Sequence, residues 1–184
     1  MYRTGTQQAH ATCRVIDPYV FFYLRWIESA PGGIFTGNGA KFWLEKIHTP
    51  AYAAWAGYAY ENLCLTHSEL IQKALSLDHV SCEVGSWSYQ SPAGRRNARG
   101  AQIDLLFDRA DGVISLCEVK FSMQTFSVDK AYALELKNKL DVFRSITKTR
   151  KDLQLVLITH EGFKPNTWSE DLVNVTLDAA KIFT

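Results

Sequence analysis

The chain has 184 residues, 47% of them hydrophobic and 21% charged, and its 20 basic and 19 acidic residues leave a net charge of +1. This length suits one substantial core and excludes two full-sized domains, and the composition excludes a disordered or fibrous chain. The near-zero charge excludes a polycation, so any nucleic-acid-binding surface must be a local patch.

Residues 1–50 differ from the rest of the chain and predict a helical, aromatic-rich lead-in. The dense aromatic stretch over residues 15–27 is the longest apolar run, but it is shorter than the about 20 residues needed to cross a bilayer, so no membrane helix is expected. It belongs either to a buried helix or to an exposed interface, for instance in a homodimer. A short helix is expected over residues 41–47.

Residues 51–184 predict a single domain with the element order α-β-β-β-α-β, a mixed sheet with helices on its faces. Thr49 and Pro50 suit the N-cap and first position of its first helix. The expected elements are a helix over residues 50–77, strands over 80–89, 101–109 and 113–121, a helix over 128–146, and strands over 153–159 and 173–177.

Charged residues interrupt two of these strands. Glu118 and Lys120 are two residues apart at the end of an apolar strand and so share one face, and Asp104 lies inside the apolar strand before it. The plain alternative is that these charges are solvated residues at strand ends.

The turn between these two strands predicts whether the charges meet. Residues 110–112 suit a three-residue hairpin loop with Gly112 in the left-handed position, and this register places Asp104 directly opposite Glu118. A two-residue loop would pair Asp104 with Cys117 instead. Opposed carboxylates repel, and Lys120 compensates only in part, so a hard divalent cation between them is the economical solution.

The spacing from Asp104 to Glu118-Val119-Lys120 resembles the signature of the PD-(D/E)XK nuclease superfamily, whose restriction-endonuclease-like core has the α-β-β-β-α-β order. Two flanking segments, residues 57–61 and 100–106, extend the likeness to the nuclease-like domain at the C-terminus of prokaryotic archaeal-type AAA/STAND ATPases. The resemblance covers most of the chain and includes the aromatic stretch.

The resemblance implies a function and a set of site residues. It implies a Mg²⁺-dependent nuclease acting on DNA, with Mn²⁺ as a possible substitute, in which Asp104 and Glu118 bind metal and Lys120 is the catalytic lysine. The Val119 carbonyl is a further expected ligand. Two more catalytic-site positions match the family, and they are Glu61 on the first helix and Gln102 beside the aspartate.

Further features bear on partners and location. Three arginines in the loop before the Asp104 strand are candidates for DNA contact, and they are Arg95, Arg96 and Arg99. No phosphate-binding loop is present, so no nucleotide site is expected and the ATPase would be a separate partner, with this chain a fragment, a shortened gene product or an isolated domain. Absence of a signal peptide and of paired cysteines favours a cytoplasmic protein.

A second function, of a different class, stays open on the sequence alone. The same fold serves as a non-catalytic module that binds DNA or docks onto an ATPase, and fold alone does not decide between them. The two abutting carboxylates favour catalysis, whereas the neutral overall charge favours the binding module.

Overall fold

A single mixed β-sheet lies at the centre of the protein. The computed structural model describes residues 14–32, 37, 39–91 and 100–184. The sheet has five strands in the order β1-β2-β3-β4-β5. Its strands are β1 (Cys82–Tyr89), β2 (Ala101–Arg109), β3 (Val113–Lys120), β4 (Asp152–Thr159) and β5 (Val175–Asp178). β1, β2 and β3 run antiparallel, while β3, β4 and β5 run parallel.

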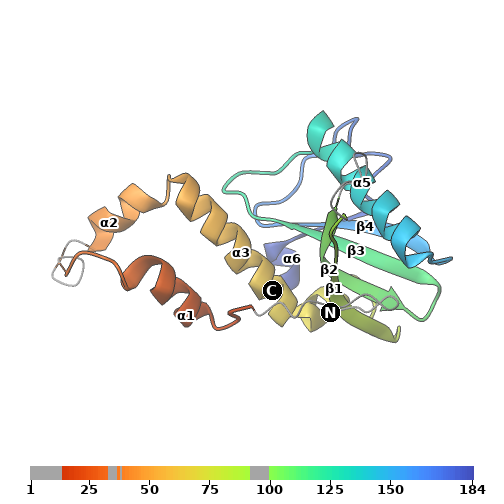
Figure 1. Ribbon diagram of the computed structural model, residues 1–184, viewed down its shortest axis with the longest axis horizontal. Helices are drawn as coiled ribbons and strands as arrows, with labels where there is room; N and C mark the ends of the chain where they lie inside the picture. Colours follow the sequence, from red (N-terminus) through yellow and green to blue (C-terminus); the bar gives the residue numbers. More distant parts are fainter. Residues whose placement is uncertain (1–13, 33–36, 38, 92–99) are drawn as a thin grey trace.

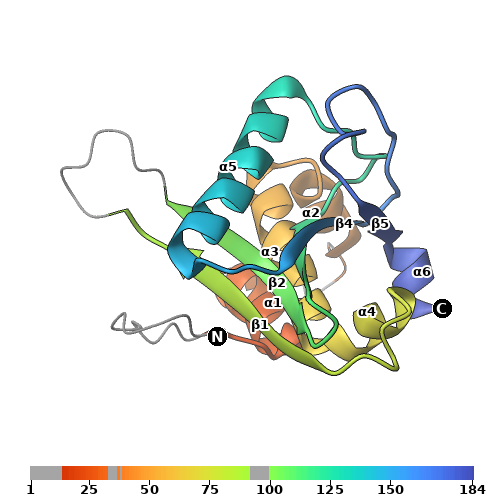
Figure 2. The same ribbon diagram turned by 90° about the vertical axis from the view of Figure 1, so that its right-hand side faces the viewer.

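Helices cover both faces of the sheet (Figures 1 and 2). On one face lie α3 (Pro50–Thr66), α4 (Ser68–Ala74) and α6 (Ala179–Phe183), whose apolar side chains share a core with alternate residues of β2, β3 and β4. On the other face lies α5 (Lys130–Thr147), which crosses over between the parallel strands β3 and β4. The expected class, an α/β protein with a helix-flanked mixed sheet, is confirmed.

The first helix of the sheet domain is shorter than the sequence predicts. Thr49 caps it as expected, its hydroxyl accepting the Tyr52 N–H at 3.2 Å. However, His67 leaves the helical conformation at φ −108° and ψ 35°, so the expected helix over residues 50–77 is two helices, α3 and α4. Beyond β5, Asp178 caps the short helix α6, which was not predicted.

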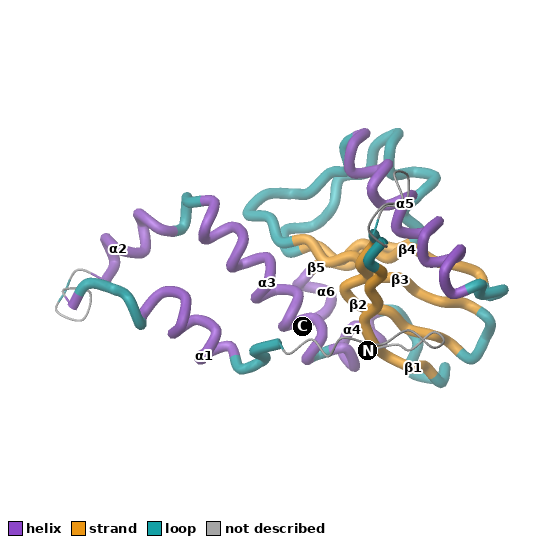
Figure 3. The backbone as a smooth tube through the Cα atoms, in the orientation of Figure 1, coloured by secondary structure: helices purple, strands orange, loops and turns teal. Residues whose placement is uncertain are grey.

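The lead-in consists of α1 (Pro18–Phe22), a π-helical turn η1 (Tyr23–Ile27) and α2 (Gly39–Lys46), which extend away from the sheet (Figures 1 and 3). Trp26 is buried against Trp43 and Trp55, so one side of the lead-in has its own aromatic core. Tyr19 and Leu24 of the same stretch are exposed. The two expectations for the aromatic stretch, buried packing and an exposed surface, therefore each apply to some of its residues.

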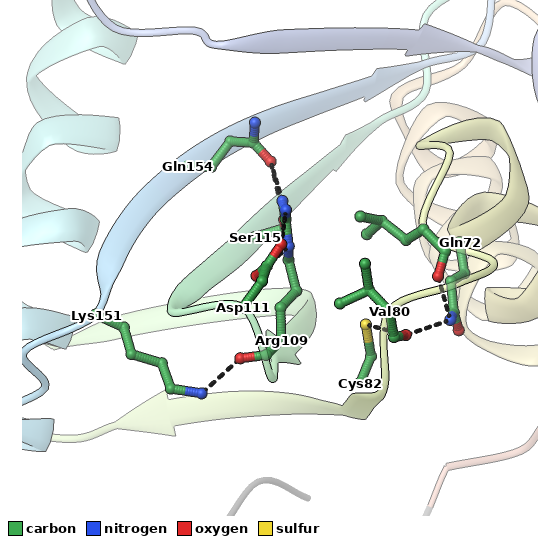
Figure 4. Close-up of polar contacts among 9 residues, drawn as sticks. Gln72, Val80, Cys82, Arg109, Asp111, Ser115, Lys151 and Gln154 are labelled. Atoms are coloured by element: carbon green, nitrogen blue, oxygen red, sulfur yellow. Dashed lines mark hydrogen bonds and ion pairs between the residues drawn. The ribbon is translucent and has the colours of Figure 1, made fainter.

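The β2–β3 hairpin turn is the one the sequence predicts. Gly112 adopts φ +91°, a conformation that side chains other than glycine rarely take. Polar contacts brace this end of the sheet (Figure 4). The Arg109 guanidinium and the Ser115 hydroxyl both donate to Gln154 of β4, at 3.3 and 2.9 Å, and Lys151 donates to the Arg109 carbonyl at 2.6 Å.

We expect Gly112→Ala to lower the free energy of unfolding by about 1–2 kcal/mol, because alanine is strained at positive φ. Gly57→Ala is the matched control, since an added Cβ meets no atom within 4 Å at either position. Gly57 lies inside helix α3, where alanine is favoured by about 0.5–1 kcal/mol. Urea unfolding of both variants measures these changes. Equal changes of the same sign in the free energy of unfolding would contradict the prediction.

Candidate active site

The observed register brings the two predicted carboxylates level with each other. Four pairs are formed between β2 and β3, from Asp108 with Ile114 to Leu105 with Cys117. One further step places Asp104 opposite Glu118, as the three-residue loop predicts. The alternative pairing of Asp104 with Cys117 is excluded.

A β-bulge in β2 falls at Asp104. On one side of it Gly85 of β1 pairs with Leu106, and on the other Trp87 pairs with Ile103. β1 therefore advances by two residues where β2 advances by three, so β2 carries one extra residue at this point. Bulges of this kind turn a side chain out of the regular alternation of the strand and are common beside active sites.

The bulge directs the buried Asp104 side chain to the neighbouring strand. Its Oδ2 accepts a hydrogen bond from the Val119 backbone N–H at 3.1 Å, and its Oδ1 lies 3.5 Å from the Gln102 side-chain amide. Burial and then the nearby Glu118 carboxylate raise the pKa of Asp104, while the Val119 N–H opposes the rise. Asp104 and Glu118 are thus close enough to interact electrostatically, as predicted.

Glu118 is only 2% exposed, and its charge is met by cations rather than by water. Lys139 of α5 donates to both carboxylate oxygens, at 2.8 and 2.7 Å. The Tyr132 hydroxyl donates to Oε1 at 2.9 Å, and the Lys120 ammonium lies 3.2 Å from the same oxygen. Glu118 follows Leu116 by two residues on the strand face that packs against α5, which explains why α5 supplies these donors.

Lys139 and Tyr132 were missed by the sequence reasoning. Lys139 is seven residues after Tyr132, so it falls on the same helical stripe as the buried Leu136 and Phe143. A charged residue on a buried stripe was the available signal. Burial alone lowers the pKa of Lys139, but the Glu118, Asp104 and Glu135 carboxylates together outweigh that effect and raise the pKa overall, so this ammonium stays charged.

Lys120 is the more accessible of the two lysines. Its side chain is 34% exposed, compared with 13% for Lys139. Its ammonium also lies over the Tyr132 ring, 4.9 Å from the ring centre. Lys120 therefore borders the carboxylates and the solvent at once, which is the position required of a group that contacts an incoming anion.

Glu61 approaches the site from α3. Its Oε2 is buried without a hydrogen bond among the described residues, and the Arg14 guanidinium lies 3.8 Å from it. Burial, followed by the charge of Asp104, raises the pKa of Glu61 from 4.5 to about 7, despite opposition from Arg14 and Lys120. The sequence-predicted Glu61 thus joins the cluster as a carboxyl that holds its proton near neutral pH.

The donor set suits a hard cation, although lysines already balance the carboxylates. Glu61, Asp104 and Glu118 each offer carboxylate oxygens, the hard ligands that Mg²⁺ prefers, and Mg²⁺ needs only one or two of them because it keeps several waters. Within the described residues, no three Asp, Glu, His or Cys side chains are grouped so as to hold a metal ion. A metal at this site would therefore have at most two of these carboxylates as ligands, and water would have to complete its coordination.

The remaining predictions from the sequence concern other parts of the chain. The proposed DNA-contacting residues Arg95, Arg96 and Arg99 fall outside the described residues. Three of the cysteines, Cys64, Cys82 and Cys117, are described and are free thiols, as predicted. Among the described helices, none has the length and apolar character needed to cross a membrane.

Comparison with known proteins gave no match: no protein family, no curated protein and no solved structure matches this chain.

We expect the stability of the protein to depend on the protonation of Glu61. The neutral carboxyl is favoured in the folded state, so its contribution is fully present below pH 4.5 and is lost as the pH rises through about 7. Glu61→Gln should therefore raise the melting temperature at pH 8 relative to the unaltered protein, and raise it less at pH 5. Glu69→Gln, at an exposed position on α4, is the control. A difference in melting temperature between Glu61→Gln and the unaltered protein that is the same at pH 5 and pH 8 would contradict the assignment.

Proposed function

We propose that this chain is a PD-(D/E)XK-type nuclease domain that hydrolyses DNA phosphodiester bonds with a divalent metal ion, preferably Mg²⁺ and alternatively Mn²⁺. The observation that carries the proposal is the bulge that turns Asp104 toward β3, beside the buried Glu118 and the accessible Lys120. These residue types, at one end of adjacent strands, suit the neutralisation of a phosphate and the positioning of a water.

The order of elements around the site supports the same proposal. From α3 onward, the sheet and its main helices follow the α-β-β-β-α-β order, apart from the division of the first helix at His67. In this order the hairpin β2–β3 carries the carboxylates, and α5 packs across them. A restriction-endonuclease-like core places its site at the corresponding position.

Each residue has a role that its environment permits. Asp104, Glu118 and the Val119 carbonyl would hold the ion, which when bound would polarise the phosphate and lower the pKa of a water. Lys120 reaches solvent and would stabilise negative charge on the phosphate. Glu61 would hold a proton or orient a water. Gln102, exposed and next to Asp104, would fix the orientation of that carboxylate.

The substrate and partner belong to the same proposal. DNA is the proposed substrate, and the loop with Arg95, Arg96 and Arg99 remains the predicted contact for its backbone. An ATPase domain or subunit of the AAA/STAND type is the proposed partner that would control this activity. The exposed residues of the aromatic stretch are the proposed contact with that partner or with a second copy of the chain.

One observation favours the second candidate, a non-catalytic DNA-binding or docking module. Two ammonium groups already form ion pairs with Glu118, and both also lower the pKa of Asp104. The buried carboxylates are thus explained without a metal or a reaction. In that case the cluster would join β3 to α5 and serve only the fold.

We expect the purified chain to cleave plasmid or single-stranded DNA in the presence of Mg²⁺ or Mn²⁺. Asp104→Asn and Lys120→Met should each reduce the cleavage rate by at least about 100-fold, since each removes a group that acts on the reacting phosphate. Asp111→Asn is the matched control, because Asp111 lies in the turn at the opposite end of the same hairpin.

The outcomes separate the two candidates. Retained cleavage in Asp104→Asn, with the fold verified by circular dichroism, would refute the assigned site. DNA binding without cleavage under all metal conditions would replace the nuclease proposal with the binding module.

A further inference from the structure

Glu118 is almost fully enclosed, and the Lys139 ammonium bridges its two oxygens. Lys139 donates to both oxygens, and Tyr132 donates to Oε1 as well. Such charge-assisted hydrogen bonds at 2.7–2.8 Å are among the strongest that a carboxylate makes. A divalent cation that binds Glu118 therefore competes for these oxygens with the ammonium that bridges them.

Exchange of the Lys139 ammonium for a divalent ion would change the net charge of the site. Counted as anions, and without the adjacent Glu61, Asp104 and Glu118 carry two negative charges against the two positive charges of Lys120 and Lys139. This cluster of four side chains is neutral. If a divalent ion takes the place of Lys139 while Lys120 stays, the cluster carries one net positive charge. A neutral site has little attraction for a phosphate, whereas a positive one favours it.

The structure also offers a place for the displaced ammonium. Glu135 lies one helical turn before Lys139 on α5, with its carboxylate 3.7 Å from the Lys139 ammonium. The Glu135 side chain is 57% exposed. Rotation of the flexible lysine side chain along the helix can thus exchange a buried partner for a solvated one while the lysine stays charged.

We propose that Lys139 competes with the metal ion for Glu118: the carboxylate binds either the Lys139 ammonium or a divalent cation. This inference rests on the proposed function, because it concerns the same site. Lys139 is accordingly a positioning residue that sets metal affinity, and Lys120 is the lysine that remains for the substrate.

Mn²⁺ binding, measured by titration calorimetry on the full chain without DNA, tests the inference. Lys139→Met removes the ammonium and keeps most of the side-chain length, and it should tighten Mn²⁺ binding by at least about tenfold. Lys137→Met, an exposed lysine on the same helix, is the matched control and should bind as the unaltered chain does. Asp104→Asn should bind much more weakly.

A second measurement uses the unaltered chain and so does not depend on the folding of a variant. Lys139 is acetylated with an amine-reactive ester, and the extent of acetylation is followed by mass spectrometry. Without metal the reaction should be slow, because the ammonium is largely buried and donates hydrogen bonds to both Glu118 oxygens. Saturating Mn²⁺ should accelerate it several-fold and leave Lys137 unchanged. If Lys139→Met fails to fold, this labelling decides the question.

The results distinguish this inference from the proposed function. Mn²⁺ binding that requires Asp104 but is not tightened by Lys139→Met, or that leaves Lys139 labelling unchanged, overturns the competition and leaves the nuclease proposal standing. Absence of Mn²⁺ binding in both the unaltered chain and Lys139→Met overturns the inference and the metal site together. Metal binding with the expected lysine effects but no DNA cleavage supports the inference and removes only the hydrolytic function.

Discussion

A carboxylate enclosed between a sheet and a helix must be neutralised, and much of the geometry around Glu118 follows from that requirement. Removal of an ionised carboxylate from water costs several kcal/mol unless cations and hydrogen bonds replace the lost hydration. Here Lys139 and Tyr132 of α5 and Lys120 of β3 supply that replacement. The buried charge therefore acts together with apolar packing to orient α5 on the sheet, because the two donors lie on the same helical stripe as the buried Leu136 and Phe143.

The two ends of the β2–β3 hairpin have different tasks. At the turn, Gly112 and the Arg109–Gln154 contacts fix the register between strands. At the other end, the bulge at Asp104 breaks the regular alternation and lets that carboxylate accept a backbone N–H of β3. A rigid turn and a local irregularity are both needed, since the first brings Asp104 level with Glu118 and the second turns it toward β3.

The sequence predicted the register between β2 and β3 correctly, but it did not predict the residues that surround Glu118. The glycine in the turn was enough to predict which residues oppose each other, because a positive φ at one position selects the loop length. The bulge was out of reach, since an extra residue in β2 depends on how two strands pair rather than on either sequence alone. Lys139 lay within reach, because a lysine among Leu136 and Phe143 on a buried stripe needs a buried partner. His67 ended the first helix without any proline or glycine to signal it.

The surroundings of Glu118 also explain why two different functions fit one geometry. A cluster whose lysines balance its carboxylates is stable by itself, so the buried acids alone do not demand a metal. The same balance is easily shifted, because Lys139 has a second carboxylate within reach at Glu135. Glu61 adds a further adjustable charge, since its pKa of about 7 lets it gain or lose a proton near neutral pH. The proposed catalytic function and the alternative binding function therefore require the same arrangement of the fold, and they differ in whether an ammonium or a divalent ion is bound to Glu118.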